Sequence, residues 1–195
     1  MRIGVLGGSF NPPHNGHLII ASDACEALKL DKLLVIPAFA NPLKGHDAEG
    51  ASPEQRLEMT RLAFGGDPRF EVSAVEMERG GLSFTVDTLE TLSRQYAGAE
   101  LVLLVGIDAL RSLDKWRSPE RIRELARLVA MSRGPESQDD AAADDFEVVT
   151  TRRIDISSSE IRSRLAEGKP VRGFVSESVE RYITAAKLYR PRSSV

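Results

Sequence analysis

Near its N-terminus the chain reads Ile3-Gly4-Val5-Leu6-Gly7-Gly8-Ser9-Phe10-Asn11-Pro12-Pro13-His14-Asn15-Gly16-His17. An apolar run of strand length leads into a glycine turn, and two histidines stand where a helix is expected to begin. Glycine lets the backbone approach a ligand closely, a helix N-terminus presents N–H groups, and imidazole can donate to developing negative charge. The stretch therefore predicts a phosphate site at a strand–helix junction.

Apolar runs of strand length alternate with amphipathic helical segments along the rest of the chain. The predicted strands are Ile3–Leu6, Leu33–Ile36, Phe70–Val72, Leu101–Val105, Leu128–Met131 and Phe146–Val149. Several of these runs show no alternation, as in strands that are buried on both faces. This order predicts a three-layer, Rossmann-like α/β domain with a mainly parallel sheet. Because ligands bind beyond the carboxyl ends of such strands, residues 7–17 and the segment Gly106-Ile107-Asp108 should face one crevice.

Length and composition point to one globular domain spanning residues 1–195. Hydrophobic residues make up 42% and charged residues 28%, and the formal net charge of −3 gives no reason to expect a nucleic-acid surface. No apolar stretch approaches the roughly 18 residues of a membrane span, so none is expected. The single cysteine, Cys25, and the absence of a leader pattern favour the cytoplasm. The acidic stretch 134–145 is expected to be a flexible surface loop.

The glycine turn does not match the other common phosphate motifs. It continues neither as the G-x-G-x-x-G of dinucleotide-binding folds nor as the P-loop pattern with its lysine. Zinc would need a third ligand, and the remaining histidine, His46, has no cysteine near it in the sequence. We therefore expect no protein-bound metal, and a phosphate site built on His14 and His17.

A second segment with phosphate-binding character lies near the other end of the chain. Ser157-x-x-Glu160 has the spacing of a capping box, so a helix should begin there with N–H groups at its tip. Three consecutive serines and Arg162 would suit a polyphosphate. Taken alone, the same residues also fit a well-capped surface helix with a solvated arginine.

Together the two segments resemble the signature motifs of the nucleotidyltransferase superfamily. The first resembles G-x-F-D-P-x-H-x-G-H, with Asn11 where aspartate is commoner, and the second is Ile156-Ser157-Ser158-Ser159-Glu160-Ile161-Arg162. The resemblance is greatest to the bacterial nicotinate-nucleotide adenylyltransferases and covers essentially the whole chain. Its further matches are Asn41-Pro42-Leu43-Lys44, Ser83-Phe84-Thr85-Val86-Asp87-Thr88-Leu89 and Val105-Gly106-Ile107-Asp108, followed by Trp116.

The resemblance implies transfer of AMP from ATP to nicotinate mononucleotide, with pyrophosphate as the second product and Mg²⁺ arriving with ATP. It assigns catalysis to His14, His17 and Arg162. It assigns ATP binding to Gly7, Gly8, Ser9, Phe10, Gly106, Asp108, Ser157 and Ser158. It assigns the mononucleotide to Lys44, Thr85 and Trp116. The reaction needs no general base, since the attacking phosphate oxygen is already ionised.

Two other functions stay open at this point. One is transfer to nicotinamide mononucleotide or another small substrate on the same fold, because the choice of ring substituent can depend on backbone groups that the sequence does not reveal. The other is a nucleotide-binding sensor that has lost turnover. Lys44 could equally be an ordinary loop lysine, and Trp116 could belong to the core.

Overall fold

The computed structural model describes residues 1–40, 50–133 and 147–190. Lys44 and His46, together with the acidic stretch predicted as a loop at 134–145, lie outside these residues. The described strands are β1 (Arg2–Gly8), β2 (Lys32–Pro37), β3 (Phe70–Val72), β4 (Glu100–Gly106), β5 (Arg127–Arg133) and β6 (Glu147–Thr151). Each contains or closely overlaps one of the predicted runs, so the strand assignment from the sequence is confirmed.

The six strands form one sheet in the order β3-β2-β1-β4-β5-β6, and every neighbouring pair is parallel. This is the strand order of a doubly wound Rossmann-type fold, in which the order reverses between β1 and β4. The sheet is thus wholly parallel, where the sequence predicted a mainly parallel one. The reversal places a crevice at the carboxyl ends of these two strands.

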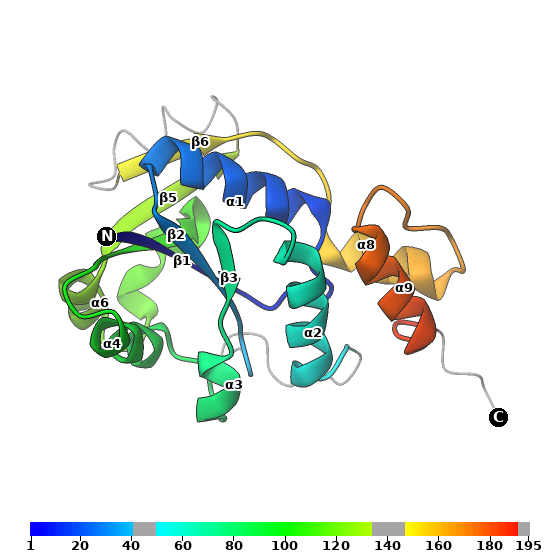
Figure 1. The fold of residues 1–195 in the computed structure, drawn as a ribbon, viewed down its shortest axis with the longest axis horizontal. Coiled ribbons are helices and arrows are strands. Elements are labelled where there is room, and N and C mark those ends of the chain that lie inside the picture. The colour runs from blue at the N-terminus through cyan, green and yellow to red at the C-terminus, as the bar shows by residue number, and fades with distance from the viewer. Residues whose placement is uncertain (41–49, 134–146, 191–195) are drawn as a thin grey trace.

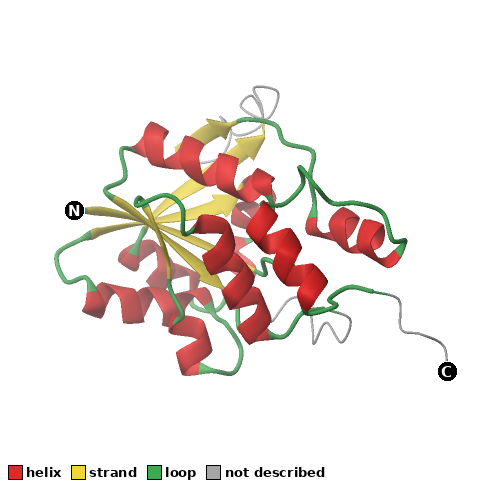
Figure 2. Cartoon of the chain, turned by 45° about the vertical axis from the view of Figure 1, so that its right-hand side comes forward, coloured by secondary structure: helices red, strands yellow, loops and turns green. Residues whose placement is uncertain are grey.

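Helices cover both faces of the sheet, as Figures 1 and 2 show. The described helices are α1 (Asn15–Leu28), α2 (Pro53–Phe64), α3 (Val75–Arg79), α4 (Thr85–Gln95), α5 (Ile107–Arg111), α6 (Pro119–Leu125), α8 (Ser158–Ala166) and α9 (Glu177–Ala185). One face packs against α1 and α2, and the other against α3 to α6. None of the helices in the described part of the chain is long and apolar enough to cross a membrane.

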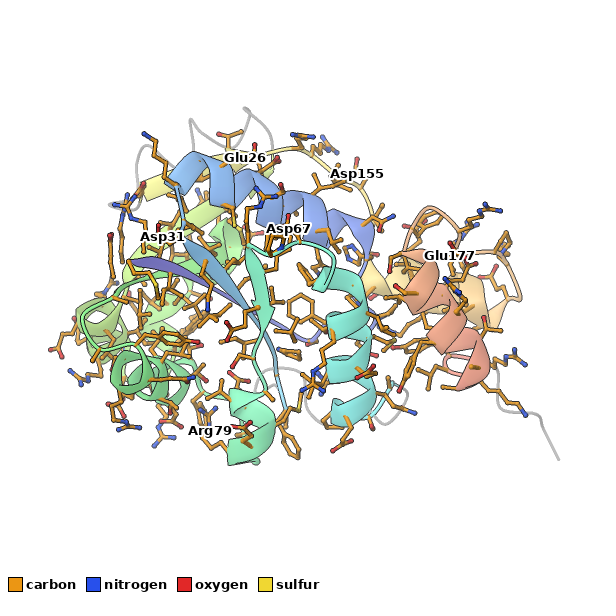
Figure 3. All side chains as sticks on the ribbon, viewed as in Figure 1. Glu26, Asp31, Asp67, Arg79, Asp155 and Glu177 are labelled. Carbon is orange, nitrogen blue, oxygen red and sulfur yellow. The ribbon has the colours of Figure 1, made fainter. Side chains whose placement is uncertain are left out.

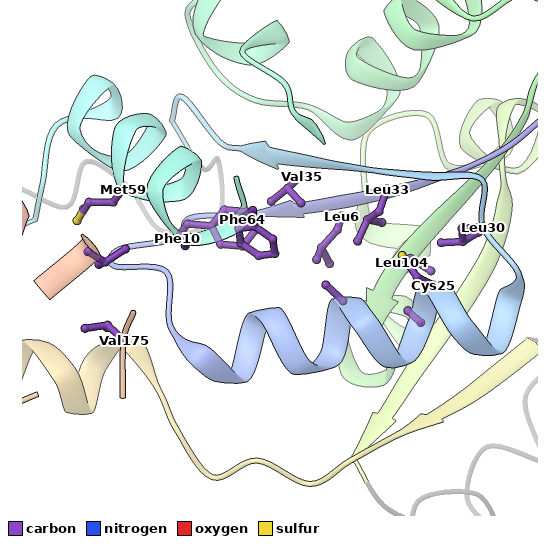
Figure 4. Close-up of a cluster of buried hydrophobic side chains, with 14 of the residues drawn as sticks. Leu6, Phe10, Cys25, Leu30, Leu33, Val35, Met59, Phe64, Leu104 and Val175 are labelled. Atoms are coloured by element: carbon purple, nitrogen blue, oxygen red, sulfur yellow. The ribbon is translucent and has the colours of Figure 1, made fainter. Parts of the chain in front are cut away.

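Two apolar cores explain why the strands are apolar without alternation. In β2, Leu33 and Val35 face the core shared with α1 and α2, whereas Leu34 and Ile36 face the opposite core. Successive side chains of a strand point to opposite faces, and here each face is covered by helices. Figure 4 shows the first of these cores, in which Cys25 and Phe64 also lie.

Ion pairs made by Arg69 connect the turn before β3 to α1. Arg69 bonds the Asp67 carboxylate at 2.6 Å, and its guanidinium also lies 3.6 Å from Glu26. The Arg69 guanidinium holds the pKa of the Asp67 carboxyl below its usual range. Figure 3 labels both acidic residues near α1. The contact lies away from the crevice residues and supports the fold.

Helices α8 and α9 lie together at one end of the molecule, beside the N-terminal end of α1 (Figure 1). The chain segment between them reaches α1 directly, since the Asn15 side chain donates to the Gly173 carbonyl at 2.9 Å. The Asn15 N–H donates to the Phe174 carbonyl at 2.8 Å. The C-terminal helices are therefore held against the segment that follows β1.

Candidate active site

His14 and His17 stand at the start of α1, as the sequence predicted. His14 is the N-cap residue, and its backbone N–H donates to Nδ1 of His17 at 3.1 Å. In a neutral imidazole only one nitrogen carries a proton, so an accepting Nδ1 leaves the proton on Nε2. Nε2 of His17 is thus a hydrogen-bond donor, which is the form that a phosphate oxygen requires.

The two imidazole rings are stacked, and the Phe10 ring packs against that of His17. The ring centroids of His14 and His17 are 3.6 Å apart at an interplanar angle of 28°. The Phe10 ring meets His17 edge-on at 5.0 Å and Phe64 at 6.0 Å. Phe10 is 3% exposed, so its side chain belongs to the core and serves the site by fixing His17. Its backbone has a φ of 46°, an uncommon conformation for a residue with a side chain.

The second predicted segment binds directly to the first. The Ser158 hydroxyl donates to the Pro12 carbonyl at 2.8 Å, and Nη1 of Arg162 donates to the Asn11 carbonyl at 2.8 Å. The helix that carries them is capped by Ser157, whose hydroxyl accepts from the Glu160 N–H at 3.1 Å. The alternative of a capped surface helix with a merely solvated arginine is therefore wrong for the arginine, because Arg162 and Ser158 both bond the turn after β1.

Arg162 retains donors beyond these contacts. Its Nη2 donates to the Ser159 hydroxyl at 3.3 Å, and a guanidinium has five N–H groups in all. Ser158 and Ser159 lie in the first turn of α8, where a backbone N–H has no carbonyl four residues earlier in the helix to bond. Within the described part of the chain, this end of α8 can thus receive an anion.

Arg56 is a site residue that sequence reasoning missed. It lies on α2, is 8% exposed, and its guanidinium donates to the carbonyls of Ser9 (2.9 Å), Ala38 (2.6 Å) and Phe39 (2.9 Å). These bonds tie the end of β1 to the end of β2. A signal was present, since Arg56 has the helical spacing of the buried Met59 and Ala63 and so shares their inward face.

A cleft of about 390 Å³ opens beside the turn, on the α4 side of the sheet. Among the predicted residues, its lining includes Gly7, Gly8, Thr85, Gly106 and Trp116. The volume falls within the usual range for small-molecule sites. The lining is mostly apolar, which suits a flat ring.

The other predicted residues of the described ranges do not line this cleft. Asp108 is exposed on α5 directly after β4, and Ser9 follows the end of β1. Ser158 and Arg162 of α8 bond the turn after β1 at Pro12 and Asn11, and the same turn leads into the two histidines at the start of α1. Within the described ranges, no three His, Cys, Asp or Glu side chains gather as a metal site would require. The turn after β1 thus borders an apolar cleft through Gly7 and Gly8 and bonds the polar side chains of α8 through Asn11 and Pro12.

Comparisons with known proteins show the family to which the chain belongs. The family model described as cytidylyltransferase-like matches residues 5–164. A protein of Gemmatimonas aurantiaca named "Probable nicotinate-nucleotide adenylyltransferase" is 48% identical, over 100% of this chain and 96% of its own. A protein of the same name from Thermus thermophilus is 44% identical over 97% and 100%.

The solved structures support the fold. The nicotinic acid mononucleotide adenylyltransferase of Plasmodium falciparum, solved in complexes with APC and with NaAD, gives a TM-score of 0.77. It covers 96% of this chain at 17% identity. The family match and the full-length relatives establish that the chain belongs to the cytidylyltransferase-like family, in the branch of the nicotinate-nucleotide adenylyltransferases.

Proposed function

We propose that this protein transfers the adenylyl group of ATP to nicotinate mononucleotide, forming nicotinate adenine dinucleotide and pyrophosphate, in NAD biosynthesis. The observation that carries the proposal is the contact of α8 with the turn after β1, made by Ser158 and Arg162. This contact brings the serines and the arginine of α8 to the turn that leads into the two histidines, and the glycines of the same turn line the cleft. The full-length relatives support the same reaction.

The chemistry is a displacement at the α-phosphorus. A phosphate oxygen of the mononucleotide forms a bond to the α-phosphorus. The bond between the α-phosphorus and the oxygen that bridges to the β-phosphate breaks, and pyrophosphate leaves. The attacking oxygen is ionised at neutral pH, so the protein has to position the reactants and stabilise charge rather than remove a proton. This requirement fits a site made of imidazole, hydroxyl, guanidinium and backbone N–H groups.

Each group has a defined task in this proposal. His17 donates from Nε2 to the α-phosphate as negative charge builds, and His14 positions it through the bond to Nδ1. The start of α8, with Ser157, Ser158 and Arg162, holds the departing pyrophosphate. Mg²⁺ reaches the site with ATP, coordinated by phosphate oxygens and water, and neutralises charge on the triphosphate. Gly106 and Asp108 take the adenosine ribose.

Selection of nicotinate is supported by the groups at the start of α4. Phe84 and Thr85 line the cleft there, and the Arg117 guanidinium lies 4.7 Å from the centre of the Phe84 ring. A carboxylate is stabilised near a helix N-terminus and a cation, whereas a neutral carboxamide gains less. Trp116 offers a face for the pyridine ring, and its buried Nε1–H has no acceptor within the described residues. Lys44 is proposed as a further contact to the mononucleotide.

The deciding experiment measures pyrophosphate release from MgATP with nicotinate mononucleotide and, separately, with nicotinamide mononucleotide. We expect the nicotinate compound to be turned over with a higher kcat and a higher kcat/KM than the nicotinamide compound. Equal or reversed preference would contradict the assigned substrate and favour a broader transferase. No turnover with either compound, together with retained ATP binding, would favour a nucleotide sensor.

The Trp116→Ala variant tests the ring subsite. It should raise the KM for the mononucleotide by about tenfold and change the KM for ATP little, because the lost stacking involves only the pyridine ring. Trp116→Phe retains an aromatic face and serves as the matched control. A larger effect on the KM for ATP than on the KM for the mononucleotide would place the adenine, rather than the pyridine ring, on Trp116.

We propose that the reaction takes place in the cytoplasm, where a reducing environment suits the buried, unpaired Cys25.

A further inference from the structure

Asn11 connects three segments that are distant in the sequence. Its side chain is buried, and Oδ1 accepts from the Tyr189 hydroxyl at 2.6 Å and from the Ala51 N–H at 3.2 Å. Its backbone carbonyl accepts from Arg162 at 2.8 Å. One residue of the turn after β1 therefore contacts the chain beyond α9, the residue just before the N-cap of α2, and the arginine of α8.

Tyr189 reaches Asn11 through an unusual backbone path. Lys187 and Tyr189 follow α9 and have φ values of 53° and 59°, in the left-handed region. Non-glycine residues occupy this region at a cost, and such outliers persist only where surrounding contacts hold them. The Tyr189 ring packs on the core beside Leu188, so packing and the hydroxyl bond together hold the conformation.

The hydroxyl of Tyr189 is a dependable donor. Burial raises the pKa of the Tyr189 phenol above its usual value, so it stays protonated over the physiological pH range. The nearby guanidinium groups of Arg162 and Arg56 act in the opposite direction but do not outweigh burial. Oδ1 of Asn11 thus accepts two hydrogen bonds from neutral groups, the Tyr189 hydroxyl and the Ala51 N–H, one for each of its two lone pairs.

The Asn11 side chain also has little room to move. A Cβ atom placed on Gly50 would lie 2.3 Å from Nδ2 of Asn11, so the glycine backbone packs directly against the amide. Together, this packing and the two hydrogen bonds hold the side chain in one position.

We propose that Tyr189 and Asn11 form a positioning pair that holds Arg162 in place for phosphate binding. The Tyr189 hydroxyl fixes the Asn11 side chain, and the fixed Asn11 presents its carbonyl to Arg162. Neither residue of the pair needs to touch the substrate. The inference rests on the proposed function, in which Arg162 binds the departing pyrophosphate, and it makes the chain beyond α9 part of the active-site architecture.

The test compares Tyr189→Phe with Tyr96→Phe. The control also removes a tyrosine hydroxyl that bonds a side-chain oxygen, since the Tyr96 hydroxyl donates to the Glu71 carboxylate at a distance of 3.1 Å. This pair lies away from the crevice. At 25 °C, with both variants folded by circular dichroism, Tyr189→Phe should lower kcat on the order of five- to tenfold, the size expected for one hydrogen bond. Tyr96→Phe should stay within about twofold of the wild type. An unchanged kcat in Tyr189→Phe overturns the proposal, whatever its effect on thermal stability.

Coupling to Arg162 separates positioning from general destabilisation. In an Arg162→Ala background, Tyr189→Phe should change kcat by less than about twofold, because the group being positioned is gone. Full additivity of the two losses would overturn the proposal.

Substitutions of Asn11 test the other partner of the pair. Asn11→Asp keeps an accepting oxygen and should retain more activity than Asn11→Ala. Equal loss of activity in both variants would contradict a role for Oδ1.

Two measurements without the second substrate distinguish failure of this inference from failure of the proposed function. Calorimetry should show weaker binding of a non-hydrolysable ATP analogue to Tyr189→Phe than to the wild type. Hydrogen exchange should be faster at the Ala51 amide, which loses a fixed acceptor. If the wild type turns over no mononucleotide but both effects appear, the proposed function fails and the positioning pair stands. If the analogue affinity and the Ala51 exchange are unchanged, the pair is overturned.

Discussion

The backbone N–H of His14 donates to Nδ1 of His17 across the first turn of α1, at 3.1 Å. This contact decides which nitrogen of His17 is the donor, because the proton of the neutral ring must then lie on Nε2. A residue at the helix cap thus selects the tautomer of the imidazole that the proposed function assigns to catalysis.

Replacement of His17 should separate this local contact from catalysis. His17→Ala should lower kcat by about 10²–10³, the loss expected for one transition-state donor. His17→Asn should lower kcat as much, yet lie closer to the wild type in thermal stability, because its short side chain can still accept from the His14 N–H. Pyrophosphate release and thermal unfolding measure the two effects. Near-normal turnover in either variant would contradict the role given to Nε2.

Removal of Arg56 should destabilise the protein and the turn after β1. Arg56→Ala leaves three carbonyls without their charged donor, so we expect a loss of about 3 kcal/mol in the free energy of unfolding. Arg56→Lys should rescue only part of this loss, since one ammonium cannot reproduce the forked geometry.

The matched control for Arg56 is Arg61→Ala on the same helix. Arg61 is exposed and lies 3.8 Å from Glu58, so its loss should cost at most about 0.5 kcal/mol. Urea denaturation at constant pH measures all three variants. Equal effects of Arg56→Ala and Arg61→Ala would refute the role assigned to the three carbonyl contacts.

Gly50→Ala should disturb the site without removing any hydrogen-bonding group. The new methyl group would displace the Asn11 amide, which lies 2.3 Å from the ideal Cβ position. We expect a kcat reduced by about tenfold if the displacement breaks the bond to Tyr189. Gly66→Ala, where a Cβ meets no atom within 4 Å, should leave kcat unchanged. A fully active Gly50→Ala would show that Asn11 can shift without consequence.

Cys25 should make the stability of the protein depend on alkaline pH. Burial raises the pKa of its thiol from 9.0 to about 11. Below pH 9 both states keep the proton, but between pH 9 and 11 the unfolded state loses it first, so stability falls as the pH rises. The fall should approach about 1.4 kcal/mol per pH unit relative to Cys25→Ala. Parallel curves for the two proteins between pH 9 and 11, from urea denaturation, would contradict this shift.

Much of the fold could be predicted because the relevant interactions are local. The apolar run of β2, buried on both faces, indicated a strand covered on both sides. The capping box at Ser157 predicted the start of α8, and the Ser157 hydroxyl accepts a bond from the Glu160 N–H. The glycine turn and its histidines likewise follow from neighbouring residues. Period, capping and turn chemistry act over a few positions, so the sequence displays them directly.

The tertiary structure alone decided how the site is assembled. Ser158 meets Pro12 across 146 positions, and Tyr189 meets Asn11 across 178. No short pattern specifies such pairs, because they depend on the packing of the C-terminal helices against the start of α1. The sequence by itself thus determined the elements, the strand ends and the residues able to bind phosphate. Packing in three dimensions decided which of those residues meet at the turn after β1, and it added Arg56, whose guanidinium bonds three carbonyls at the ends of β1 and β2.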